Sequence, residues 1–188
     1  GKRNLYTIEH LLSSLAGCGM SYILIQVEGK EIPLLDGSAI EWVRAFEEVG
    51  IKRVPKPFNY MREISEPQIF NKDDSVIAIT PSNKLTIIST IDFSYKAIGK
   101  QTFVIDLNPK CYVDLIAPAR TFGFKDQFQE LGELGLIKGG SLENALVCDG
   151  DNWVNPPLRF ANEPIRHKIL DLIGDLALVG LPKAQIIV

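Results

Sequence analysis

The sequence predicts an α+β fold in which helices and strands form layers, and two observations carry that prediction. Segments with strand-like alternation are mixed with segments that have a helical apolar stripe, and most connections between them are short. Residues 52–57 hold two prolines and three positive charges, which is typical of a linker. We therefore predict two domains, the first over residues 1–52 and the second over residues 53–188.

The first domain is predicted to hold two helices and one strand. Thr7 is expected to cap a helix that ends at Gly17 and has an apolar stripe of Leu11, Leu12, Leu15 and Ala16. Alternation predicts a strand over residues 22–28. Ser38 and Glu41 have the spacing of a capping box, which starts a second helix with Trp42, Val43, Phe46 and Val49 on one face.

The second domain is predicted to begin with strands and to close with a well-specified helix. Strands are expected at residues 60–64, 75–80, 84–92, 101–106 and 145–148, with a helix from Pro109 to Ile116, a segment at 119–124 and a helix near 126–134. The last helix starts at Pro164, has its inner face formed by Ile165, Ile169, Leu172, Ile173 and Leu176, and ends before Gly180. Residues 185–188 have a strand-like pattern at the point where the chain stops.

Composition excludes several classes of protein. The net charge of -3, the pI near 5.5 and the scattered lysines and arginines argue against a nucleic-acid binder. The three widely spaced cysteines form no CxxC pair, so we expect a reducing compartment, the cytoplasm, rather than a disulfide framework. No apolar run approaches the ~20 residues of a membrane span. The chain begins without Met, so we expect a piece of a longer protein.

The residues with the strongest chemical signal are the two histidines of the chain and the acids near them. His167 and Asp171 are four residues apart on the last predicted helix, so their side chains lie on one face, one turn apart. His10 follows Glu9 on the first predicted helix. Two histidines and one carboxylate leave the fourth position of a tetrahedral zinc site open for water, and a neighbouring carboxylate can act as general base.

The same residues also have an ordinary structural interpretation. A His and an Asp four residues apart are most often a solvated helix face, and His10 can be a half-buried histidine with a satisfied hydrogen bond. Asp175 extends the acidic row by another turn, and a row of His, Asp and Asp on an otherwise apolar helix is less ordinary than any single member. Spacing alone leaves the two interpretations open.

Longer motifs distinguish the two interpretations. Five stretches carry them: TIEHLLSSLAG from Thr7, EIPLLDGSA from Glu31, ARTFGF from Ala119, GGSLENA from Gly139, and LRF from Leu158 followed by Glu163, RHKILD from Arg166 and IGDL from Ile173. In order and approximate spacing these stretches resemble the UDP-3-O-acyl-N-acetylglucosamine deacetylases. They span nearly the whole chain, which is therefore identified as a member of this family.

The resemblance implies a zinc-dependent deacetylase of lipid A synthesis that removes the N-acetyl group of a UDP-linked, 3-O-acylated glucosamine. It implies one Zn²⁺ per chain, with Fe²⁺ as the alternative metal. The implied ligands are His10, His167 and Asp171. Glu9 would be the general base, Thr121 would bind the oxyanion, Lys168 would contact the polar part of the substrate, and Asp175 would orient a general-acid histidine.

The family fold implies two α+β sandwiches whose helices face each other across the metal, in a monomer. An insert near residues 124–145 would hold the acyl chain. The resemblance suggests contacts to the substrate from Phe122, Phe124, Gly140, Ser141 and Leu142, although ordinary core packing explains the apolar members equally well.

The chain also departs from the family pattern. It lacks the opening strands and the later Gly-His segment that supplies the general acid, so we expect residues 1–188 alone to bind zinc with little or no turnover. Two other hypotheses remain: a truncated or degenerate relative that binds zinc or a ligand without catalysis, and a metal hydrolase of a different acylated amine.

Overall fold

The computed structural model describes residues 4–52, 54, 61–126 and 142–188. In this part of the chain four helices and nine strands form two sheets. The helices are α1 (Glu9–Gly17), α2 (Ile40–Val49), α3 (Pro109–Leu115) and α5 (Glu163–Ala177). The strands are β1 (Arg62–Glu63), β2 (Gln68–Lys72), β3 (Ser75–Pro81), β4 (Thr86–Asp92), β5 (Lys100–Asp106), β6 (Phe122–Phe124), β7 (Leu146–Asp149), β8 (Asn152–Trp153) and β9 (Pro182–Ile187). The predicted α+β class is confirmed.

The larger sheet has the order β2-β3-β9-β4-β5, with β1 paired to β9. The last strand of the described chain, β9, is inserted at its centre, antiparallel to β3 and parallel to β4. Ile186 pairs with Ile79 on one side and with Ile87 on the other. The smaller sheet joins β6, β7 and β8. The segment that directly follows the last helix therefore forms the central strand of the sheet that covers this helix.

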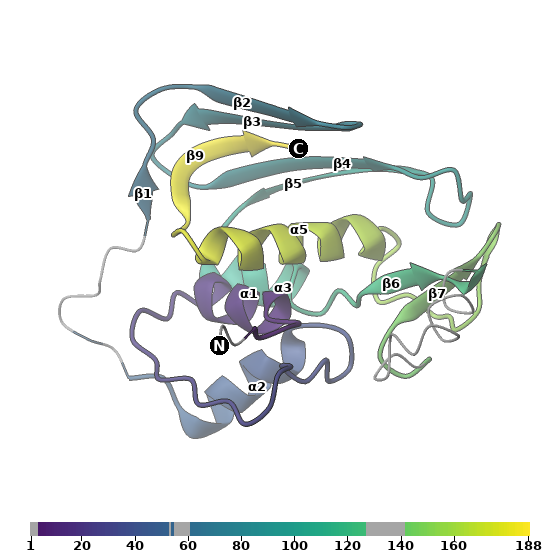
Figure 1. Cartoon of the computed structure of the whole chain (residues 1–188), viewed down its shortest axis with the longest axis horizontal. Helices are drawn as coiled ribbons and strands as arrows, with labels where there is room; N and C mark the ends of the chain where they lie inside the picture. Colours follow the sequence, from purple (N-terminus) through teal and green to yellow (C-terminus); the bar gives the residue numbers. More distant parts are fainter. Residues whose placement is uncertain (1–3, 53, 55–60, 127–141) are drawn as a thin grey trace.

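Helix α5 lies against the larger sheet and separates it from the other helices, so that the layers run sheet, α5, then α1 and α3, with α2 outermost (Figure 1). The apolar period of α5 explains its place, because Ile165, Ile169 and Ile173 are fully buried. Ile169 and Ile173 share one core with Ile87 and Ile186 of the sheet, and Ala39 and Val43 from the start of α2 join the same core. Residues from both sides of the predicted linker are thus packed in one cluster.

Several sequence expectations for the first 52 residues were wrong. Thr7 does not cap α1, because its hydroxyl donates to Glu31 Oε1 at 2.8 Å and the residue before the helix is Ile8. Residues 22–28 form no strand, since no described segment pairs with them. Ser38 and Glu41 do not form a capping box: Ser38 Oγ accepts from the Ile40 backbone N–H at 3.3 Å. Val49, expected on the inner face of α2, is 83% exposed.

The second part of the chain follows the sequence more closely. The predicted strands correspond to β1, β3, β4, β5, β7 and β9, and the helix from Pro109 is α3, capped by the Asn108 side chain. Strands β2 and β8 were not predicted. The helix expected near residues 126–134 and the glycine-rich turn at 139–140 lie, apart from the first residue of that helix, outside the described residues. Within the described chain, no helix is both long and apolar enough to cross a membrane.

The central place of α5 in the core gives a first prediction. Ile169→Ala should lower the free energy of unfolding by about 2–5 kcal/mol, because it removes fully buried methyl groups and leaves a cavity between helix and sheet. Leu178→Ala, at an exposed position just after the helix, should change it by less than about 0.5 kcal/mol. Urea denaturation of both variants measures the difference, and equal losses would contradict the assigned core.

Candidate metal centre

Two histidines and one aspartate converge where α1 meets α5. His167 Nε2 lies 3.2 Å from Asp171 Oδ1, and His10 Nε2 lies 3.8 Å from the same oxygen. The candidate ligand atoms of all three residues are within 4.8 Å of one another. The two imidazole rings meet edge to face, with centroids 4.9 Å apart. The structure thus brings together two histidines that are 157 positions apart in the sequence. The spacing of residues around either histidine could not predict this contact.

In the His10–His167–Asp171 triad the two imidazole rings are withdrawn from water, while the Asp171 side chain is 24% exposed. The side chains of His10 and His167 are 3% and 2% exposed. Burial, helped by the nearby His167, lowers the pKa of His10 from 6.5 to about 4, against the opposing pull of Asp171 and Asp36. Burial alone would raise the pKa of Asp171, but the charge and hydrogen bond of His167, together with Lys168, hold it well below its usual range. At neutral pH the triad therefore presents an uncharged His10 beside an ionised Asp171.

A hydrogen bond on the far side of His167 orients its ring. His167 Nδ1–H donates to the Ala119 carbonyl oxygen at 3.0 Å, which leaves Nε2 facing Asp171. An unprotonated Nε2 and a carboxylate oxygen both carry lone pairs, so a 3.2 Å approach calls for a proton or a cation between them. For His10, Nδ1 is buried and has no hydrogen-bond partner among the described residues.

The triad fits a zinc ion by both ligand type and spacing. Imidazole nitrogen and carboxylate oxygen are ordinary zinc ligands at 2.0–2.2 Å, so two ligands of a tetrahedral site stand about 3.3 Å apart. The separations of 3.2 and 3.8 Å from Asp171 are close to that value. Three protein ligands would also leave one position open.

Three further predicted residues flank the triad. Glu9 directly precedes His10 at the start of α1 and is half-buried. Lys168 Nζ donates to Asp171 Oδ2 at 3.0 Å. Asp175, one turn beyond Asp171, has its pKa raised by partial burial and by the Asp171 charge, which Lys168 partly offsets. Lys168 and Asp175 thus add charged groups to α5 beside the triad, and Glu9 adds one to α1.

Thr121 is held by its backbone in the segment between α3 and β6, close to the residue that contacts His167. Its N–H donates to the Gly37 carbonyl at 2.7 Å, and its carbonyl accepts from the Leu146 N–H at 2.8 Å. It lies two residues after Ala119, the partner of His167. Thr121 therefore has a fixed place between the loop before α2 and β7.

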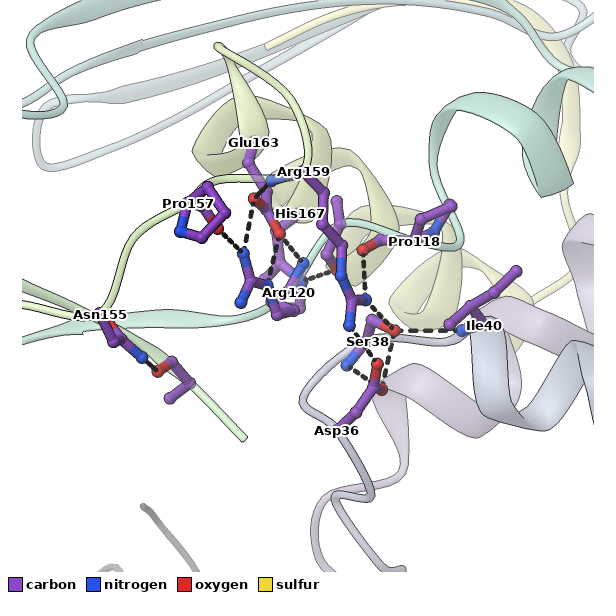
Figure 2. A network of polar contacts seen from close by, with 12 residues as sticks. Asp36, Ser38, Ile40, Pro118, Arg120, Asn155, Pro157, Arg159, Glu163 and His167 are labelled. Atoms are coloured by element: carbon purple, nitrogen blue, oxygen red, sulfur yellow. Dashed lines mark hydrogen bonds and ion pairs between the residues drawn. The ribbon is translucent and has the colours of Figure 1, made fainter. Parts of the chain in front are cut away.

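Sequence reasoning assigned no role to Glu163, whose carboxylate is fully buried one turn before His167. Oε1 accepts from the Arg120 backbone N–H and from Arg120 Nε, each at 2.9 Å, and Oε2 accepts from the Arg159 N–H at 2.6 Å and Arg120 Nη2 at 3.3 Å (Figure 2). Glu163 belongs to the matched stretch that contains His167 and lies four residues before it, which was the available signal. The carboxylate therefore holds the backbone of Arg120, the residue between Ala119 and Thr121.

Arg159 extends these contacts toward the first part of the chain, and we call Glu163, Arg120, Arg159, Asp36 and Ser38 the Glu163 cluster. Arg159 Nη2 donates to Asp36 Oδ2 at 2.8 Å, and Nη1 donates to Ser38 Oγ at 3.3 Å (Figure 2). Burial opposes ionisation of Asp36, but the hydrogen bonds and charge of Arg159 and the bonds from Ser38 lower its pKa. The cluster thus joins the start of α5 to the loop before α2.

The apolar residues suggested for the substrate lie at one side of the fold. Phe122 and Phe124 pack with Phe93, and Tyr95 stacks on Phe124 with ring centroids 4.3 Å apart. Leu142 is 55% exposed. Gly140 and Ser141 lie outside the described residues. The two phenylalanines are therefore part of an aromatic cluster with the loop between β4 and β5.

A cavity of about 720 Å³ opens beside Asp171 of the triad, between α5 and the larger sheet. Lys168, Asp171 and Asp175 line it from α5, and residues 89–93 and Lys100 line it from β4 and β5. The volume is in the range of small-molecule sites. These charged residues of α5 therefore face a space large enough for a ligand.

The chain is similar to known proteins over nearly its whole length. The profile of the family described as UDP-3-O-acyl N-acetylglycosamine deacetylase matches residues 1–188. Proteins named UDP-3-O-acyl-N-acetylglucosamine deacetylase are also similar to the chain. The one from Trichormus variabilis is 48% identical over 98% of the chain and 68% of its own length. Those from Synechocystis and Oleidesulfovibrio alaskensis are 45% and 44% identical, over 96% and 94% of the chain and 66% and 58% of their own lengths. The chain thus spans about two thirds of the relatives it matches, or somewhat less.

The buried carboxylate of the Glu163 cluster gives a second prediction. Glu163→Gln should lower the free energy of unfolding by about 3–5 kcal/mol, because it leaves the Arg120 charge without its partner and turns an amide donor toward other donors. The control is Glu63→Gln, the same change at an 83% exposed side chain 3.1 Å from Lys183, with an expected loss below about 0.5 kcal/mol. Urea denaturation of both variants measures the difference. Similar unfolding midpoints would contradict the role of Glu163 as the buried partner of Arg120.

The lowered pKa of His10 gives a third prediction, for the protein freed of metal by a chelator. Between pH 6.5 and about 4 the unfolded chain binds a proton on His10 that the folded chain does not, so stability falls as the pH falls through this interval. The expected loss is up to about 3 kcal/mol. Urea denaturation across this range measures it. His10→Gln removes the titrating ring and should show a shallower slope; an unchanged slope would refute the prediction.

Proposed function

The chain belongs to the UDP-3-O-acyl N-acetylglycosamine deacetylase family, and from this membership we propose that its protein is a zinc-dependent amidohydrolase. Its substrate would be a UDP-linked, 3-O-acylated N-acetylglucosamine, whose N-acetyl group is hydrolysed in a step of lipid A synthesis. The observation that carries the proposal is the convergence of His10, His167 and Asp171 from two distant segments of a chain that the family profile matches throughout.

We assign the zinc ligands to His10 Nε2, His167 Nε2 and a carboxylate oxygen of Asp171. The donor set and the separations of 3.2 and 3.8 Å support this assignment, as does the Ala119 carbonyl that orients His167. Bound zinc would lower the pKa of a coordinated water and polarise the carbonyl of the amide. Fe²⁺ is an alternative occupant of the same donor set.

The chain's own residues would supply the proton transfer and part of the charge stabilisation. Glu9 would accept a proton from the attacking water, since it directly precedes the ligand His10. Thr121 would donate a hydrogen bond to the carbonyl oxygen as that oxygen gains negative charge. Its fixed backbone supports the role, because a donor that is already in place need not reorganise during the reaction.

Lys168 and Asp175 would act at the polar end of the substrate site. Both line the cavity beside Asp171, and Lys100 adds a second cation from the sheet. Lys168 would contact the polar part of the substrate, and Asp175 would orient a general-acid histidine through a hydrogen bond. Phe122, Phe124 and Leu142, with Gly140 and Ser141, would contact the acyl chain; the aromatic packing of Phe122 and Phe124 supports an apolar surface there.

We also propose the arrangement of the whole protein. Residues 1–52 would be the remainder of one α+β sandwich, and residues 53–188, with an acyl-chain insert near 124–145, would be a second. The helices of the two would face each other across the metal, as α1 and α5 do around the triad. The protein would act as a monomer in the cytoplasm, where its three free and widely spaced cysteines fit a reducing environment.

The ligand and base assignments are tested by two substitutions in the full-length protein. His167→Ala should lose bound zinc, because a ligand is removed, while Glu9→Ala should keep zinc and lose about 10²–10⁴ in kcat, the usual cost of a missing general base. Metal analysis and a deacetylase assay on the same preparations separate the two effects. If both variants kept metal and activity, the site would be wrongly assigned.

A further inference from the structure

A glycine separates the two helices that carry the triad. Gly174 of α5 faces the backbone of Glu9 at the start of α1. A Cβ atom placed on Gly174 would lie 2.2 Å from the Glu9 carbonyl oxygen, 2.9 Å from its carbonyl carbon and 3.0 Å from its Cα. The first of these distances is well inside van der Waals contact, so any side chain at this position would push the helices apart.

The contact lies beside the candidate metal centre. Gly174 follows Asp171 by three residues and His167 by seven, so all three occupy one face of α5. Glu9, whose backbone rests on the glycine, directly precedes His10. The backbone that carries the proposed base and one proposed ligand is therefore in contact with the helix that carries the other two ligands.

The glycine has no conformational reason to be there. Gly174 is inside α5 and its φ is helical, a conformation that every residue adopts. Glycine is a poorer helix former than alanine, so the helix by itself would be more stable with a side chain at this position. The absence of a side chain at Gly174 instead allows the backbone of Glu9 to lie close to α5.

We propose that Gly174 is a positioning residue for the reaction. Its missing side chain sets the distance between α1 and α5 at which Glu9 and His10 meet His167 and Asp171. To restore ordinary contact, an added methyl group must move the Glu9 backbone by about 1 Å, a displacement that can cost about 10²-fold in rate when it affects reacting groups. The inference rests on the proposed function and adds to it the residue that fixes the geometry of the site.

The chain contains a matched control at the other end of α1. A Cβ atom on Gly17 would lie 2.3 Å from Cδ2 and Cγ of the Tyr112 ring, and Tyr112 is fully buried. Gly17 also has a helical φ, but it follows Glu9 by eight residues, about 12 Å along the helix. The two glycines thus receive the same methyl group with a similar overlap, and only Gly174 touches the backbone at the triad.

The test compares Gly174→Ala with Gly17→Ala in the full-length protein. Both variants should have a lower Tm. Gly174→Ala should bind Zn²⁺ about 10- to 100-fold more weakly in competition with a chelator, as when other groups that position ligands are changed. Its kcat should fall about 10²-fold, with KM within about threefold of the wild type. Gly17→Ala should keep the wild-type Zn²⁺ affinity and kcat to within about threefold.

Three outcomes of this comparison would contradict the role of Gly174 or the proposed function. Equal Zn²⁺ affinity and kcat in the two variants would overturn the inference, because the loss would then follow from destabilisation alone. Failure of Gly174→Ala to fold would overturn it as well, because the inference requires that α1 can shift by about 1 Å with the core intact. If the wild-type protein itself bound no Zn²⁺, the proposed function would fail; if the wild type bound Zn²⁺ and Gly174→Ala bound it equally well, only the inference would fail.

Discussion

Where α1 crosses α5, two buried imidazole rings meet an ionised carboxylate that is only 24% exposed, and the surrounding structure compensates for their loss of water. A carboxylate removed from water needs hydrogen-bonding or charged partners, which His167 and Lys168 supply to Asp171. His10 has no such compensation at Nδ1, and its pKa is lowered to about 4 because the charged ring is disfavoured there. A cation shared by the three side chains would satisfy the lone pairs that face one another at 3.2 and 3.8 Å, and it would stabilise the contact between the two helices.

The segment that runs toward β6 is fixed residue by residue. The Ala119 carbonyl accepts from His167, the Arg120 N–H donates to Glu163, and the Thr121 N–H donates to Gly37. The first two partners are on α5, one turn apart, and the third is in the loop before α2. Because successive backbone groups are bonded to two different elements, this segment cannot move without disturbing the ring of His167. The proposed oxyanion contact and the orientation of a proposed ligand therefore depend on the same short stretch of backbone.

Periodicity predicted the parts of the structure that depend on local pattern. The face of α5 that holds Ile165, Ile169 and Ile173, and the shared face of His167 and Asp171, follow from helical spacing, and both are observed. The place of His10 does not follow from spacing, because it depends on how α1 packs against α5. The bond from His167 to Ala119 and the pair of Glu163 with Arg120 join residues 48 and 43 positions apart, so no local signal shows them. The strand expected at residues 22–28 fails for a related reason: alternation describes the two faces of a segment, whereas a strand also needs a neighbour.

The first and second parts of the chain are held together by contacts other than those of the triad. Ala39 and Val43, from the first 52 residues, are in the same core as Ile87 and Ile186 of the sheet. Arg159 bonds to Asp36 across the same boundary. These contacts hold the first part of the chain to the second without help from the triad, whose candidate ligand atoms lie within 4.8 Å of one another. The chain therefore differs from small zinc domains, in which the binding free energy of the metal is also the folding free energy. In this chain a metal would stabilise a fold that the core and the Glu163 cluster already specify, and its geometry would be set by the contact between α1 and α5.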